Sequence, residues 1–114
     1  MVKAEIISIG SELLLGQIVD TNASWMAQRL TDVGVDLYYK TTVGDNPGRM
    51  KEVLSRAINR SDIVIAGGGL GPTQDDITRE IIAEVLKVEL IRDPALVKQI
   101  DERFQSRGLI MTSN

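Results

Sequence analysis

The feature that most constrains the fold of this chain is a glycine-rich run from Ala66 to Gly71. It lies between an apolar β-branched stretch at 63–65 and an amphipathic pattern that begins at Ile77. This order predicts a buried strand, a tight turn and a helix, an arrangement in which backbone N–H groups can face an anion. The run has no GxxxxGK(S/T) sequence, and Pro72 stands where a GxGxxG motif needs its third glycine. We therefore predict a phosphate-binding turn outside both of these common motifs.

The rest of the chain alternates between stretches typical of buried strands and stretches typical of amphipathic helices. We predict strands at 4–9, 35–43 and 62–66, and helices that start at 20–22, at 46–48, at about Thr73 and at Pro94. Strands that alternate with helices imply right-handed crossovers and a mostly parallel sheet. The predicted fold class is α/β, a three-layer α/β/α domain with a mostly parallel sheet.

Polar and glycine residues gather in the loops that follow the three predicted strands, at 10–22, 44–47 and 67–76. Parallel strands end at the same edge of a sheet, and ligands bind beyond the carboxyl ends of such strands. We therefore predict that these three loops form one site.

The composition excludes several kinds of chemistry. The 114 residues contain no cysteine and no histidine, so catalysis has to use carboxylates, a bound metal, Lys or Arg, hydroxyls or backbone dipoles. The net charge of −3 argues against binding to nucleic acid. No window approaches the roughly 18 apolar residues of a membrane span, and Glu5 and Glu12 do not suit a secretory signal. We expect a cytoplasmic protein with no nucleic-acid or membrane partner.

The glycine-rich run supplies the predicted phosphate contacts, which are Gly68, Gly69, Gly71 and Thr73. Glycine lets the backbone adopt positive φ and approach a ligand closely. Thr73 offers a hydroxyl and a cap for the helix that we predict to follow, with Pro72 in its first turn. A tight turn without a ligand is the alternative, but such turns rarely need four glycines in five positions.

Three motifs resemble the amino-terminal domain of the competence/damage-inducible protein CinA family. They are GSELLLGQIVDTN at 10–22, TVGD at 42–45 and GGLGPTQDDITRE at 68–80. That domain is similar to the molybdopterin-binding fold of MoaB and MogA, so the resemblance implies a fold of this kind. It also implies a single domain over 1–114 that is incomplete at its carboxyl end. The family pattern has threonine where this chain has Gly67, which removes one hydroxyl that could face a ligand.

The resemblance also implies a function, which is metal-dependent hydrolysis of a nucleotide-type pyrophosphate. ADP-ribose would be split to AMP and ribose 5-phosphate with Mg²⁺, Mn²⁺ or Co²⁺, and a metal-activated water suits a chain without histidine. Two alternatives stay open: molybdopterin binding or adenylylation in molybdenum cofactor biosynthesis, and a non-catalytic regulatory or assembly role. The expected partner is a small-molecule nucleotide or pterin phosphate, and we expect a homo-oligomer.

Four carboxylates are candidate metal ligands, namely Asp76, Asp75, Asp45 and Glu12, and two of them, Asp76 and Asp45, are candidate catalytic groups. Asp75 and Asp76 adjoin the predicted helix start, where the helix dipole stabilises negative charge and a divalent ion could bridge to phosphate. The functional role of Asp45 is implied by the resemblance, as is the preference for Asp76. The alternatives are helix caps for Asp75 and Asp45 and a solvated loop acid for Glu12.

Two further candidate ligand contacts, Ser11 and Asn22, lie on the first loop, and a helix cap is the alternative for Asn22. Large apolar side chains recur at helical spacing, including Trp25, Met26 and Phe104. We interpret these three as packing residues rather than as part of a cofactor site.

Overall fold

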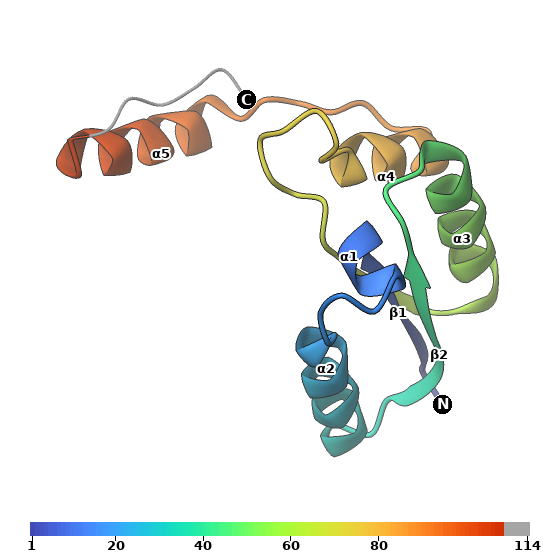
Figure 1. Cartoon of the computed structure of the whole chain (residues 1–114). Coiled ribbons are helices and arrows are strands. Elements are labelled where there is room, and N and C mark those ends of the chain that lie inside the picture. Colours follow the sequence, from blue (N-terminus) through green and yellow to red (C-terminus); the bar gives the residue numbers. More distant parts are fainter. Residues whose placement is uncertain (109–114) are drawn as a thin grey trace.

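A computed structural model describes residues 1–108 and has the α/β order predicted from the sequence (Figure 1). Its elements, in chain order, are β1 (Lys3–Ile9), α1 (Ser11–Leu14), α2 (Thr21–Asp32), β2 (Asp36–Val43), α3 (Pro47–Arg60), β3 (Ile63–Gly67), α4 (Thr78–Leu86) and α5 (Pro94–Ser106). Every end of the three predicted strands lies within one residue of its predicted position, and the last helix starts at Pro94 as predicted.

The three strands form one parallel sheet in the order β2-β1-β3. The chain therefore moves from β1 to one side through α2, and then crosses back over β1 through α3 to reach β3. Right-handed crossovers in opposite directions place their helices on opposite faces of a sheet. Figure 1 shows α2 on one side of the strands and α3 with α4 on the other, which confirms the predicted layers.

The core forms mainly between β1 and the helices α3 and α4. Ile7 and Ile9 of the central strand pack with Met50 and Leu54 of α3 and with Ile81 of α4. Alternate residues of β1 face α2 across the other side of the sheet. Because both faces of β1 are covered, all of its residues from Ala4 to Ile9 are buried, the polar Glu5 and Ser8 included.

The helix predicted from about Thr73 begins only at Thr78, so the predicted roles of Pro72 in its first turn and of Thr73 as its cap are wrong. Residues 73–77 form a loop because the Asp76 carboxylate accepts hydrogen bonds from the N–H (3.1 Å) and the hydroxyl (2.6 Å) of Thr73. A local side-chain bond of this kind competes with helix formation.

Two predictions about packing are also wrong. Trp25 is 62% exposed, although its helical spacing predicts a packing residue. Phe104 is only partly buried, and no residue of α5 is buried. Figure 1 shows α5 extending away from the sheet, so its apolar face packs on no core among the described residues.

Candidate ligand site at the sheet edge

The order of the strands creates a switch point between β1 and β3. The chain leaves the carboxyl end of β1 toward β2, and it leaves the carboxyl end of β3 toward α4 on the opposite face. A crevice therefore opens between the two strand ends, which is where open α/β sheets bind their ligands. A cavity of about 600 Å³ lies there, a volume typical of small-molecule sites.

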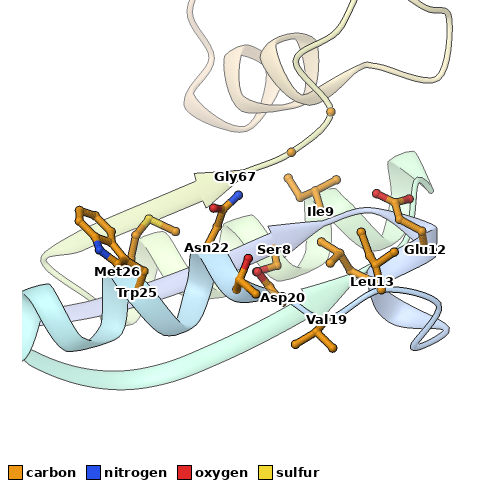
Figure 2. A pocket seen from close by; sticks show the side chains of 14 residues that line it. Ser8, Ile9, Glu12, Leu13, Val19, Asp20, Asn22, Trp25, Met26 and Gly67 are labelled. Carbon is orange, nitrogen blue, oxygen red and sulfur yellow. The ribbon is translucent and has the colours of Figure 1, made fainter.

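Residues from four segments line this cavity. Ser8 and Ile9 come from β1, Glu12 and Leu13 from α1, and Gly67–Gly69 from the end of β3 and the turn after it. The remaining wall is the first part of α2 and the loop before it, residues 18–22 and 25–26. Figure 2 shows Trp25 and Met26 at one end of the cavity and Glu12 at the other, with Asn22 and Gly67 between them.

The glycine turn is held from behind by Thr78, the buried first residue of α4. The Thr78 hydroxyl donates to the Gly68 carbonyl at 2.7 Å, and its N–H donates to the Gly69 carbonyl at 3.2 Å. Within residues 1–108, the N–H groups of Gly68 and Gly69 form no hydrogen bond to a protein acceptor. The turn thus has both carbonyls bonded and two N–H donors left at the edge of the cavity.

Positive φ is required at two of the glycines, as predicted, since Gly68 has φ 100° and Gly69 has φ 67°. A Cβ at Gly68 would lie 2.1 Å from the Ile9 carbonyl oxygen, and one at Gly69 would lie 2.2 Å from the Thr78 hydroxyl. These two glycines therefore have a structural role, whether or not a ligand is bound. Gly67 has no neighbour within 4 Å of the position of a Cβ, so the cavity reaches its backbone.

Gly71 and Thr73 lie outside this cavity, in a second turn that closes on Asp76. The hydrogen bonds from the hydroxyl and N–H of Thr73 stabilise the charged carboxylate and lower the pKa of Asp76, and the nearby positive charge of Arg79 acts in the same direction. Asp75 is exposed in the same loop. The structure thus brings Thr73 and Asp76 together, but not at the cavity wall.

Ser11 and Asp45 pair with each other at the ends of β1 and β2. The Ser11 N–H donates to the Asp45 carboxylate at 3.3 Å, and the Asp45 N–H donates to the Ser11 hydroxyl at 3.2 Å. Asn46, rather than Asp45, caps α3 by accepting from the N–H of Arg49 at 3.0 Å. The pair ties two loops together and does not line the cavity.

The four predicted metal ligands therefore lie in three places: Glu12 on the cavity, Asp45 beside Ser11, and Asp75 with Asp76 in the second turn. Within residues 1–108, no three acidic side chains gather closely enough to form a metal site. The side chains present in that part of the chain do not by themselves fit a bound divalent ion.

Sequence reasoning missed Trp25 and Met26 as parts of the site, because a helical apolar stripe is usually read as core. Asn22, Trp25 and Met26 follow the i, i+3, i+4 spacing of one helix face, and this face borders the cavity. The signal that identifies the face is its position, since α2 begins directly after the first loop at the ligand-binding edge. Asp20 is used locally, because its carboxylate caps α2 by accepting from the N–H of Ala23 at 3.0 Å.

Comparison with known families agrees with this architecture. Residues 5–113 match the family model described as "Probable molybdopterin binding domain". The chain belongs to this family. It is also 53% identical over 110 residues to a CinA-like protein of Dictyoglomus turgidum, and 50% identical over 110 residues to one of Dictyoglomus thermophilum. Each match covers 96% of this chain and 27% of the relative, so the chain spans about a quarter of the length of these curated relatives.

Solved structures place the fold in the same group. The protein CinA of Thermoplasma acidophilum, whose function is described as unknown, superposes with a TM-score of 0.86 at 31% identity, covering 97% of this chain and 64% of that one. The molybdopterin biosynthesis enzyme MoaB of Thermus thermophilus has a TM-score of 0.66 at 26% identity, over 79% of this chain and 58% of its own. The predicted fold class and the resemblance to CinA and MoaB/MogA are confirmed.

No helix formed by residues 1–108 is long and apolar enough to cross a lipid bilayer.

Proposed function

We propose that the cavity between β1 and β3 binds a phosphate-bearing pterin of the molybdopterin type. The observation that carries this proposal is the turn at Gly68 and Gly69, which offers two N–H donors at a cavity of about 600 Å³. Membership of the molybdopterin-binding family names the class of ligand that such a cavity would take.

A phosphate in this cavity would be bound through the backbone. The described lining residues include no lysine or arginine, so the peptide N–H groups have to supply the positive potential. The turn adjoins the amino end of α4, whose dipole favours an anion. Of the two acidic residues on the wall, Asp20 is held as a helix cap, and Glu12 lies at the end away from Trp25 (Figure 2), where its negative charge opposes an anion placed beside it.

Substitution of Gly67 tests the proposal without disturbing the turn. A side chain at this position meets nothing within 4 Å and extends into open space beside the cavity. Calorimetric titration with molybdopterin should show Gly67→Ala within a few-fold of the unaltered chain and Gly67→Leu weakened at least tenfold. Both variants should keep the circular dichroism spectrum and the urea midpoint of the unaltered chain. Equal affinity in all three proteins, or no binding to any, would reject the proposal.

Metal-dependent hydrolysis of ADP-ribose to AMP and ribose 5-phosphate is the second candidate. It is supported by the CinA-like motifs and by the Glu12 carboxylate on the cavity wall. The assay is chromatographic detection of AMP with Mg²⁺, Mn²⁺ or Co²⁺, comparing Glu12→Gln, Asp45→Asn and Asp76→Asn. Hydrolysis predicts AMP release that needs the ion and is lost in the variants.

Two other roles are distinguished by the same samples. Transfer of AMP from ATP to bound molybdopterin would indicate adenylylation, whereas a chain that binds neither ligand would fit a regulatory or assembly role. Homo-oligomer formation stays a prediction, which light scattering after size-exclusion chromatography can measure.

A further inference from the structure

We infer that Trp25 forms a stacking wall for a flat heteroaromatic ring, so that the site selects phosphate esters that carry such a ring. This inference rests on the proposed function, because it places the phosphate of the same ligand at Gly68 and Gly69. It adds a specificity-determining side chain that the glycine turn alone does not provide.

The exposure of Trp25 is the first observation. It is the only tryptophan of the chain, it is 62% exposed, and it lies on the cavity wall. An indole is one of the largest apolar surfaces a protein can bury, and here it stays open although α2 packs on the sheet through Ala23. An open indole beside a cavity favours a ligand rather than the core as its partner.

The cavity has two chemically different ends, which suit the two parts of such a ligand. The glycine turn presents N–H donors, whereas Trp25 and Met26 present an aromatic ring and a polarisable thioether. Figure 2 shows Asn22 between these ends. Within residues 1–108 the Asn22 amide forms no hydrogen bond, so both its donor and its acceptor remain available to the edge of a ring.

Arg29 restrains the indole without competing for an anionic ligand. Its guanidinium carbon lies 5.8 Å from the centroid of the Trp25 ring, within the range of a cation–π contact. The same guanidinium pairs with Asp32 at 3.1 Å. The positive charge is therefore matched locally, and the contact helps to hold the ring in place on α2.

The test compares ligands that have a ring with one that lacks it. The probes are AMP, neopterin monophosphate and ribose 5-phosphate, titrated by calorimetry and, for weak binding, by ligand-observed NMR. The proteins are the unaltered chain, Trp25→Ala, Trp25→Phe and a control, Val33→Ala, which removes another exposed apolar side chain beside the same helix.

We expect Trp25→Ala to weaken binding of the ring-bearing phosphates by about tenfold, which is the usual loss of one base–aromatic stack. Binding of ribose 5-phosphate should not change. Trp25→Phe should keep most of the affinity, and Val33→Ala should keep all of it. In the unaltered chain, tryptophan fluorescence should be quenched with the same Kd as the calorimetric one. A preference for neopterin monophosphate over AMP would identify the ring as a pterin, and the reverse would identify it as adenine.

The failure of this inference differs from failure of the proposed function. If the ring-bearing phosphates bind the unaltered chain and Trp25→Ala equally well, Trp25 does not stack and only the inference is overturned. If the ring-bearing phosphates bind neither protein, the proposed function is overturned as well. A fluorescence maximum that moves with protein concentration and not with ligand would place Trp25 against a second copy, which also overturns the inference.

Discussion

The two ends of β1 use polar residues in opposite ways. At its amino end, Glu5 is 1% exposed and its carboxylate is held by two other residues of the chain. It accepts from Nε of Arg60 at 2.9 Å, from Nη2 of Arg60 at 2.8 Å and from the hydroxyl of Ser61. The Arg60 guanidinium also stacks over Tyr39, 3.6 Å from the ring centroid. This cluster is complete without a ligand.

At the carboxyl end of β1, polar groups stay available. Gly68 and Gly69 bond their carbonyls to Thr78 but leave their N–H groups without an acceptor in residues 1–108. The two ends of β1 thus differ in whether their polar groups are bonded within the chain. Where a buried charge has matched partners it holds elements together, and where donors face a cavity they can recognise another molecule.

The largest effect should come from adding one methyl group to the glycine turn. Gly68→Ala forces a positive φ on a residue with a Cβ and moves that atom against the Ile9 carbonyl oxygen, so we expect a loss of about 3 kcal/mol of stability. Gly67→Ala is the matched control, with open space and no positive φ, and should change stability by less than about 0.5 kcal/mol. Urea unfolding measures both. Equal losses would show that the turn has no such constraint.

The next largest effect should come from the amino end. Glu5→Gln keeps the shape of the side chain but removes the charge that Arg60 and Ser61 bond to, which should cost about 2 kcal/mol at neutral pH. Ligand affinity should not change, because the cluster lies at the opposite end of β1 from the cavity. A fall in affinity without a fall in stability would contradict the separation of the two ends.

Acid should remove the stability that the charged Glu5 carboxylate contributes. The hydrogen bond from Arg60 and its positive charge, together with Ser61, lower the pKa of Glu5 below the ordinary value of 4.5 despite burial. The folded chain therefore binds this proton less readily than the unfolded chain. The contribution is fully present above about pH 5.5 and declines as pH falls below about 4.5 through the folded pKa. The stability difference between the unaltered chain and Glu5→Gln should shrink over that range. A constant difference would mean that Glu5 is not the titrating group.

The smallest effect should come from Thr78→Val, which keeps the shape and removes the hydroxyl bonded to the Gly68 carbonyl. We expect a loss of about 1 kcal/mol, together with a several-fold loss of phosphate affinity because the turn is held less firmly. Thr31→Val is a control, since its hydroxyl bonds within α2 and is exposed. Similar affinity losses in the two variants would rule out a specific role for Thr78.

Much of the fold could be predicted from the sequence, because strand and helix periodicities are local. The strands and the glycine turn fall where β-branched runs and glycines place them. The start of α4 could not be predicted, since it depends on Asp76 turning back to Thr73. Nor could the position of Trp25 beside the cavity, because an apolar stripe looks the same whether it faces a core or a cavity. The loops were placed at the correct edge, but only the tertiary arrangement separates Asp45 from Asp76.

The anchoring of the glycine turn by Thr78 has a consequence for motion. Thr78 forms the hydrogen bonds that hold the turn, and it is also the first residue of α4. Helix α4 in turn packs on α3 and is linked to it by the Lys51–Glu84 ion pair at 2.7 Å. A ligand that binds to the turn therefore also stabilises the first turn of α4. Amide hydrogen exchange should report this coupling: occupancy of the cavity should slow exchange along α4, on the face of the sheet opposite α2.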